Sequence, residues 1–134
     1  MIEIPKPIID DMISHAREGF PLEVCGILGG TGATVSAIYR MANTDASNEH
    51  FMMAPKEQFA VIKDLRSKGL TMLAIYHSHP ETPARPSEED IKLALTPDVS
   101  YLIISLADAA LPDIKSYKIS SGNVQPEAIK AIVY

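Results

Sequence analysis

The residues best suited to chemistry are two histidines, His77 and His79, which end the apolar run 71–79. If this run forms a β-strand, both side chains point to the same face, because alternate residues of a strand face the same way. Two neutral imidazoles placed together supply half of the tetrahedral shell that zinc prefers. A His-x-His pair also arises by chance. Taken alone, it fits two solvent-facing histidines at a strand end equally well.

A proline-rich connection follows the histidines and leads to two further candidate residues. Pro80, Pro83 and Pro86 occur at every third position, and each proline restricts its own backbone and that of the preceding residue. We therefore expect a stiff, extended connection that ends at Ser87, where a helix is expected to begin. Asp90 lies three residues later, in the first turn of that helix.

Ser87 and Asp90 allow two interpretations. A serine followed three positions later by an acid can form a capping box, in which both side chains satisfy free backbone N–H groups at the start of a helix. This is the commoner explanation of the two residues, but it accounts for neither the histidines nor the stiff connection. Alternatively, Asp90 turns toward the strand end and completes a His, His, Asp set of ligands. Such a set leaves one position of a zinc ion open for water, as in catalytic sites.

Other metalloenzyme classes fit these residues less well. Two histidines and a carboxylate also form the iron site of non-haem Fe(II) oxygenases, which need further open positions on the metal. Zinc nucleoside deaminases use a pair of cysteines as ligands, and this chain has a single cysteine, Cys25. Iron therefore stays open as an alternative, whereas the deaminase ligand set is excluded.

The spacing H-x-H-x7-S-x2-D, formed here by His77, His79, Ser87 and Asp90, resembles the motif of the JAMM (MPN+) metalloproteases. That family also has an upstream glutamate, and PLEVCGILGG offers Glu23 in a similar E-x-C-G-x-L context. The resemblance covers most of the chain and implies a single JAMM domain over residues 1–134. It also implies an α/β (α+β) fold, a deaminase-like sandwich with a curved mixed β-sheet, helices packed on it and a zinc site at its rim.

The resemblance assigns a role to each of these positions. His77, His79 and Asp90 would bind zinc, and Ser87 would hydrogen-bond the developing oxyanion. Glu23 would hold the zinc-bound water, act as general base and pass the proton to the leaving amine. Without the histidines, Glu23 would more simply be a surface acid after a helix end.

The resemblance also implies the reaction and the partner. The expected reaction is cleavage of an amide or isopeptide bond after the C-terminal Gly-Gly tail of a ubiquitin-like or sulfur-carrier protein, bound by addition of a strand to a sheet edge. The leaving group stays open between a lysine side chain, a peptide amine and a cysteine adduct. The alternative is a non-catalytic MPN-type protein-binding scaffold, but such relatives typically lose ligands, and all five motif residues are present here.

Hydrophobic periodicity predicts the elements that must position these residues. Apolar residues three or four apart predict a helix over 6–18, which Gly19 and Pro21 end. Further helices are expected over 56–68 and 87–95. Strands are expected at 2–4 (an edge strand), 24–30, 34–42, 51–54, 71–79, 99–107, 114–120 and near 124–134.

Composition limits the class of protein. A chain of 134 residues suits one domain, and its formal net charge of −5 without a basic stripe argues against nucleic-acid binding. We find neither an apolar run long enough to span a membrane nor an export signal, and a single cysteine suits a reducing cytoplasm. Cys25 is expected in the core, His15 at the surface and His50 outside the ligand set.

Overall fold

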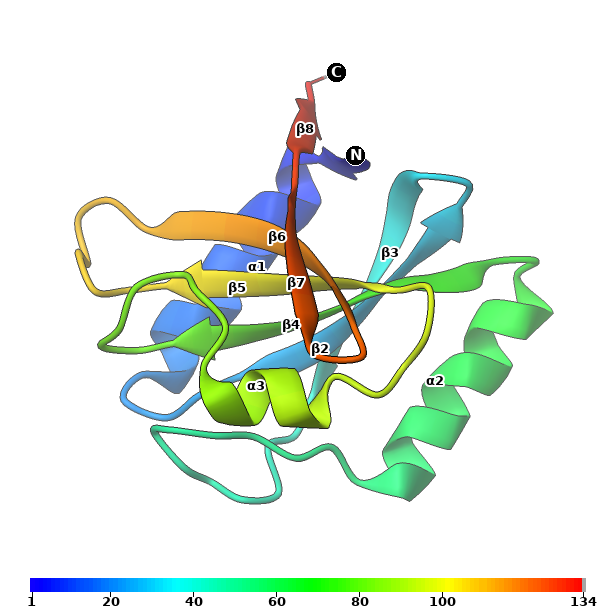
Figure 1. Cartoon of the computed structure of the whole chain (residues 1–134). Helices are drawn as coiled ribbons and strands as arrows, with labels where there is room; N and C mark the ends of the chain where they lie inside the picture. The colour runs from blue at the N-terminus through cyan, green and yellow to red at the C-terminus, as the bar shows by residue number, and fades with distance from the viewer. Residues whose placement is uncertain (134) are drawn as a thin grey trace.

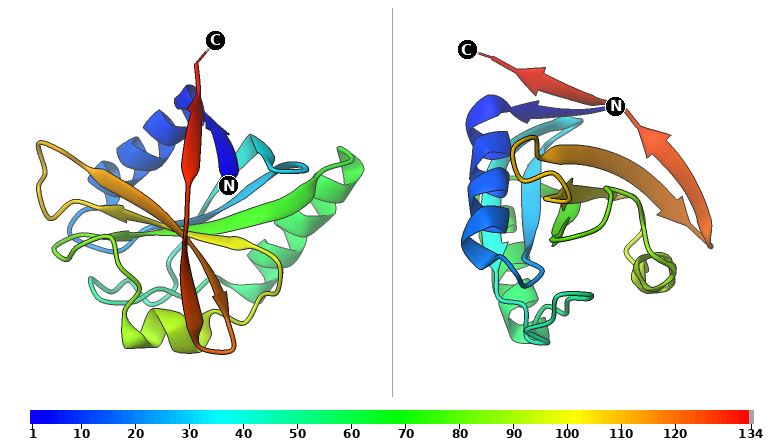
Figure 2. Two further views of the ribbon diagram at one scale, coloured as in Figure 1. Left: turned by 45° about the horizontal axis from the view of Figure 1, so that its top comes forward. Right: turned by 90° about the vertical axis from the view of Figure 1, so that its left-hand side faces the viewer.

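The computed structural model describes residues 1–133, which form one eight-stranded sheet and three helices (Figure 1). The strands follow the order β7-β6-β5-β4-β2-β3-β1-β8. Parallel pairing joins β1 to β3 and to β8, and β4 to β5, and the other pairs are antiparallel. The sheet is strongly curved (Figure 2), which confirms the predicted α/β class with a curved mixed sheet. The strands are β1 (Ile2–Pro5), β2 (Cys25–Thr31), β3 (Thr34–Met41), β4 (Thr71–His79), β5 (Ser100–Ser105), β6 (Asp113–Ser120), β7 (Asn123–Glu127) and β8 (Ile129–Ile132).

The helices cover opposite faces of this sheet. Helix α1 (Lys6–Gly19) packs Met12 and Ala16 against one face, where they join the largest core cluster. Helix α2 (Pro55–Ser67) and the short helix α3 (Glu88–Leu93) lie over the other face, and Ile75 packs against the clusters under both. Figure 2 shows α1 and α3 on opposite sides. None of the helices in residues 1–133 is long and apolar enough to cross a membrane.

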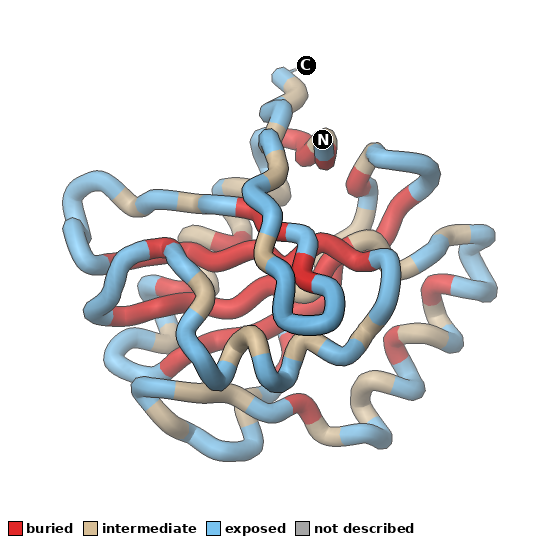
Figure 3. Tube along the Cα trace, viewed as in Figure 1, coloured by how far each residue is buried: buried red, intermediate tan, exposed pale blue. Residues whose placement is uncertain are grey.

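The centre of the sheet is buried on both faces. Strand β5 is buried at each of its residues, and the last four residues of β4 are buried as well (Figure 3). A continuous apolar strand covered on both faces is typical of the parallel part of a sheet. The end of β4 therefore lies within the core.

The last part of the chain connects the two edges of the sheet. Strand β7 pairs with β6 at one edge, β8 pairs with β1 at the other, and only Ala128 separates them. Glu127 lies at this junction and accepts hydrogen bonds from the hydroxyls of Ser100 (2.6 Å) and Ser116 (2.7 Å). The N-terminal ammonium of Met1 is 3.5 Å from the same carboxylate. These contacts fasten the N-terminus and the junction of β7 and β8 to the beginning of β5.

Several predicted element boundaries were wrong. Residues 51–54 form no strand, because they belong to an irregular loop in which Met52 O accepts hydrogen bonds from Thr44 N and Oγ1. Strand β1 is not an edge strand, since β8 covers its outer side. The segment near 124–134 holds two strands, and residue 134 lies outside the described residues. Helix α3 ends at Leu93, two residues before the predicted end.

Candidate metal centre

The two histidines lie at the end of the central strand β4. His77 pairs with Cys25 of β2 on one side and with Ile103 of β5 on the other, and His79 pairs with Ser105. Their side chains point to the same face, as strand alternation predicts, while Ser78 faces the other way and accepts a hydrogen bond from Val24 N. Both rings are buried, with relative exposures of 3% and 4%.

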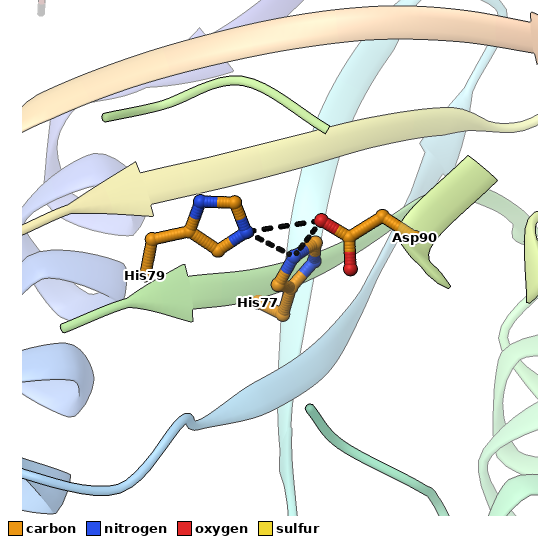
Figure 4. Close-up of side chains that lie close together, drawn as sticks. All are labelled: His77, His79 and Asp90. Atoms are coloured by element: carbon orange, nitrogen blue, oxygen red, sulfur yellow. Dashed lines mark hydrogen bonds and ion pairs between the residues drawn. The ribbon is translucent and has the colours of Figure 1, made fainter. Parts of the chain in front are cut away.

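Asp90 reaches both histidines from the first turn of α3 (Figure 4). Its Oδ2 lies 3.2 Å from Nε2 of His77 and 3.0 Å from Nε2 of His79, and the two Nε2 atoms are 3.1 Å apart. Three ligands about 2.0–2.1 Å from a tetrahedral zinc ion stand roughly 3.3 Å apart. The three donor atoms are therefore spaced almost as a zinc ion would hold them.

The hydrogen bonds of His79 indicate that a cation belongs between these atoms. Nδ1 of His79 lies 2.8 Å from the backbone oxygen of Pro83, which can only accept, so Nδ1 carries the proton. In the neutral ring, Nε2 then presents a lone pair to the carboxylate oxygen of Asp90. Two acceptors at this distance repel each other unless a proton or a metal ion lies between them. A metal ligand whose other nitrogen donates to a carbonyl is the usual arrangement of histidine in zinc sites.

The pKa values in the trio are shifted from their ordinary ranges. Burial lowers the pKa of His77. Burial also lowers the pKa of His79, but its hydrogen bonds to Asp90 and Pro83 outweigh this effect and raise the pKa. Burial raises the pKa of Asp90, but its contacts with the rings of His77 and His79 and with the backbone N–H of Ser87 hold it well below its usual range. Asp90 therefore stays ionised and able to bind a cation.

Asp90 also forms the capping box that the sequence offered as an alternative. Ser87 Oγ accepts a hydrogen bond from Asp90 N (3.0 Å), and Asp90 Oδ2 accepts one from Ser87 N (2.9 Å). The two interpretations are thus compatible. The cap holds the carboxylate in the orientation in which the same oxygen faces the histidines.

Glu23 lies in the segment that enters β2 and is buried, with a relative exposure of 3%. Its Oε1 has no hydrogen-bond partner among the described residues. Burial raises the pKa of Glu23 to about 8. Glu23 lines a pocket together with His79 and Ser87. The structure therefore gathers all five motif residues at one end of β4.

Phe51 and His50 lie near this site; Phe51 was not identified from the sequence, and His50 was expected outside the ligand set. The ring of Phe51 stacks on that of His77, with centroids 4.7 Å apart and planes inclined by 25°. His50 lines the same pocket as Phe51 and His77, and its Nδ1 pairs with Asp45 at 2.9 Å. Both belong to the aperiodic loop 42–54, whose sequence carries no signal of this contact.

His15 and Cys25 lie away from the metal ligands. His15 was expected at the surface but is half-buried, and its Nδ1 lies 2.7 Å from the hydroxyl of the buried Tyr76. Cys25 is fully buried, as predicted for a core residue, and burial raises its pKa to about 12.

A curved mixed sheet with this His, His, Asp trio at its rim defines a protein of the JAB/MPN class. The sequence model for prokaryotic homologs of the JAB domain (Prok-JAB) matches residues 5–120, and the chain belongs to this family. The resemblance seen in the sequence is therefore confirmed.

Curated relatives support the same class. The chain is 31% identical over 134 residues to the "CysO-cysteine peptidase" of Mycobacterium tuberculosis, covering 98% of this chain and 92% of the relative. It is 37% identical over 103 residues to the "Desampylase" of Haloferax volcanii, covering 72% of this chain and 74% of the relative. These matches confirm the predicted enzyme class, a peptidase of the JAMM type.

Solved structures share the fold. A protein from Desulfitobacterium hafniense, whose structure was determined in solution, has a TM-score of 0.88 and 46% identity, covering 100% of this chain and 93% of its own. A JAB1/MPN domain protein from Archaeoglobus fulgidus has a TM-score of 0.68 at 18% identity, covering 98% of this chain and 97% of its own. The fold is therefore that of the JAB1/MPN domain.

Proposed function

We propose that this protein is a zinc-dependent hydrolase that cleaves an amide or isopeptide bond after the C-terminal tail of a ubiquitin-like or sulfur-carrier protein. The observation that carries the proposal is the trio of His77, His79 and Asp90, which brings three donor atoms within 3.2 Å of one another beside the unpartnered carboxylate of Glu23. We further propose that residues 1–134 act as one JAMM domain and that the protein works in the cytoplasm.

The trio would hold zinc through Nε2 of His77, Nε2 of His79 and Oδ2 of Asp90. Zinc bound there would lower the pKa of a water molecule to about 7 and polarise the scissile carbonyl. The remaining groups of this chain would then bind, orient and move protons. Pro83 O keeps the ring of His79 in the required orientation by accepting the hydrogen bond from Nδ1.

Glu23 is suited to move the proton. A general base works best when its pKa lies near the working pH, and burial raises the pKa of Glu23 to about 8. Its free Oε1 can accept a proton from the attacking water and donate it to the leaving amine. Both proton transfers would thus pass through one buried carboxylate.

Ser87 is suited to stabilise the oxyanion. Its hydroxyl accepts a hydrogen bond from Asp90 N, but a hydroxyl also has one proton to donate. Ser87 is exposed and lines the pocket that contains Glu23 and His79. A hydroxyl directed at the tetrahedral oxygen typically contributes about 3 kcal/mol.

The names of the relatives support the substrate class. They describe a CysO-cysteine peptidase, a desampylase and, in Thermus thermophilus, a probable TtuB-protein conjugate cleaving protease. Each name refers to a conjugate or an adduct of a second molecule. We propose a partner whose tail ends in Gly-Gly, because glycine lacks a Cβ and passes as an extended strand through a narrow cleft.

The decisive experiment is incubation of the zinc-loaded protein with carrier proteins that bear C-terminal extensions, followed by intact mass measurement. We expect cleavage after Gly-Gly that a chelator abolishes and zinc restores. The variant Glu23→Gln should keep its zinc but lose about 10²–10⁴-fold in rate, as expected for removal of a general base. Unchanged cleavage by this variant, or iron as the metal with oxygen consumption, would contradict the proposal.

A further inference from the structure

Two pockets of opposite character lie on either side of the trio. The apolar pocket touches His77 and Asp90 and is bounded mainly by apolar side chains such as Phe51, Leu93 and Ile103; its other polar members are His50 and Glu89. The acidic pocket touches His79 and is lined by Glu23, Asn48, Glu49, Glu81, Thr82 and Ser87. A substrate held across the trio would therefore meet mainly apolar groups beside His77, where Glu89 is the one acid besides Asp90, and several carboxyl groups beside His79.

The path of the proton decides which side receives the leaving amine. In hydrolysis, the C–N bond breaks, the acyl carbon takes the oxygen of water and the nitrogen takes a proton. Glu23 would deliver that proton, and it lines the acidic pocket, whereas the apolar pocket contains none of its atoms. The leaving amine must therefore lie on the side of the acidic pocket.

Within the described part of the chain, no basic side chain pairs with the exposed acids of this pocket. Glu49 and Glu81 are exposed, neither forms an ion pair among residues 1–133, and no lysine or arginine lines the pocket. Glu23 adds a third carboxyl group, which is buried and whose Oε1 lacks a partner. An unpartnered buried acid that shares a pocket with two free acids is an arrangement that a cationic or proton-bearing group would satisfy.

Both walls of the acidic pocket are anchored to the rest of the fold. The loop before Glu49 is joined to the backbone of Glu23, since Glu23 N donates to Ser47 O (2.8 Å) and Asn43 Nδ2 donates to Glu23 O (3.0 Å). Beside Glu81, Thr82 O accepts a hydrogen bond from Ser105 Oγ (2.6 Å). The two acids therefore approach the leaving group from walls that are attached to the sheet.

We propose, as a consequence of the proposed function, that the acidic pocket binds the leaving-amine side of the substrate and selects against a free carboxylate there. A lysine side chain or an internal peptide amine brings no carboxylate close to the scissile nitrogen. A single amino acid at the end of a carrier brings its α-carboxylate within two bonds of that nitrogen, where it faces Glu49 and Glu81. The preferred substrates are therefore protein conjugates, and single-residue adducts are disfavoured.

The test uses two synthetic peptides with the same sequence ending in Gly-Gly-Ala, one with a free carboxylate and one with a C-terminal amide. With the zinc-loaded protein we expect kcat/KM to be about tenfold higher for the amide, as one screened like-charge contact would give. In the double variant Glu49→Gln/Glu81→Gln, this ratio should fall toward one. The control Asp10→Asn/Asp113→Asn removes the same charge from acids that do not line the pocket and should keep the ratio.

A binding measurement separates this inference from the proposed function. Alaninamide is a cation and alanine carries a carboxylate, so alaninamide should shift the backbone amide resonances of Glu49 and Glu81 more strongly, and only in protein that retains both acids. Cleavage with an equal ratio for the two peptides, or a ratio unchanged in the double variant, would overturn the inference and leave the function standing. If neither peptide nor any carrier protein is cleaved, the proposed function is wrong. Equal resonance shifts with alaninamide and with alanine would show that the acidic pocket does not prefer an amine without a carboxylate.

Discussion

At the scale of single residues, Asp90 explains how a helix start becomes part of a metal centre. Its Oδ2 accepts a hydrogen bond from the backbone of Ser87 and also faces Nε2 of His77 and of His79. The cap orients the carboxylate, so that little conformational freedom remains to be lost when an ion binds. One oxygen atom, Asp90 Oδ2, therefore both caps the helix and serves as the proposed metal ligand.

Substitution of Ser87 should separate its cap from its proposed role in catalysis. Ser87→Ala removes the N-cap and should lower the free energy of unfolding by about 1 kcal/mol. It should also slow cleavage by about 10²-fold through loss of the donor to the oxyanion. Chemical denaturation and peptide cleavage measure the two effects.

The matched control is Ser87→Asp. Aspartate is a good N-cap but, when ionised, has no proton to donate. We expect this variant to recover the stability and to remain slow. Recovery of both would show that the hydroxyl of Ser87 serves the helix alone.

The sequence predicts the relative positions of some site residues but not of others, for a physical reason. Strand alternation has a strict period of two, so the shared face of His77 and His79 follows from spacing alone. The position of Asp90 requires the path of the proline-rich connection, which spacing restricts but does not determine. Phe51 stacks on His77 from a loop without periodicity, and a contact of this kind depends on tertiary structure that no local pattern encodes.

At the scale of elements, strand β2 must lie very close to the aromatic side chain of β4 next to the site. A Cβ on Gly26 would meet the ring of Tyr76 at 2.1–2.5 Å, far inside a normal contact. Tyr76 is fully buried and precedes His77. The absence of a side chain at Gly26 therefore allows the close approach of β2 to the strand that carries the two proposed histidine ligands.

Gly26→Ala should consequently be destabilising. The ring of Tyr76 must shift to admit the methyl group, and overpacking of a core typically costs about 1–3 kcal/mol. A lower midpoint of thermal unfolding and weaker zinc binding are the expected results.

Ala37→Gly provides a control in the neighbouring strand β3, where a methyl group is removed from a half-buried site rather than added. Its cost should come from backbone entropy and remain near 1 kcal/mol, with zinc binding retained. Wild-type stability and zinc affinity in Gly26→Ala would show that the ring of Tyr76 is free to move.

Turn and helix signals in the sequence predicted most elements, whereas the closure of the sheet could not be predicted. The pattern near 124–134 suggested one strand, but the chain leaves one edge at Glu127 and joins the other edge at Ile129. Which strands pair across such a distance depends on the curvature of the whole sheet. The alternation of apolar and polar residues within one segment does not predict that curvature.

At the scale of the whole molecule, Glu127 stabilises the junction where the chain passes from one edge of the sheet to the other. Its ionisation makes the stability of the protein depend on pH. Its side chain is 10% exposed and accepts hydrogen bonds from Ser100 and Ser116. Burial raises the pKa of Glu127, but these hydrogen bonds outweigh it and lower the pKa below its ordinary value of 4.5. A lowered folded-state pKa means that its contribution is present above the unfolded-state pKa and is lost as the pH falls through the folded-state pKa.

Glu127→Gln should therefore reduce stability in a manner that depends on pH. At pH 7 we expect a loss of about 2 kcal/mol, because hydrogen bonds to a charged acceptor are replaced by neutral ones. The difference from wild type should shrink as the pH falls below 4.5, the ordinary pKa of this carboxyl group. Urea denaturation at several pH values measures it.

Asp10→Asn is the control for this experiment. It removes an exposed carboxylate whose ion pair with Lys6 is open to solvent and should change stability by less than about 1 kcal/mol at pH 7. A difference between Glu127→Gln and wild type that stays constant from pH 7 to pH 3 would contradict the role of the ionised carboxylate.

The fastening of Met1 and Glu127 beside Ser100 has a practical consequence for handling the protein. Strand β5 runs parallel to β4, so its beginning lies at the far end from His79, and Met1 and Glu127 are held there. An affinity tag, fluorophore or bead attached at Met1 would lie away from the trio of His77, His79 and Asp90. The enzyme can thus be immobilised through its N-terminus with the trio turned away from the surface.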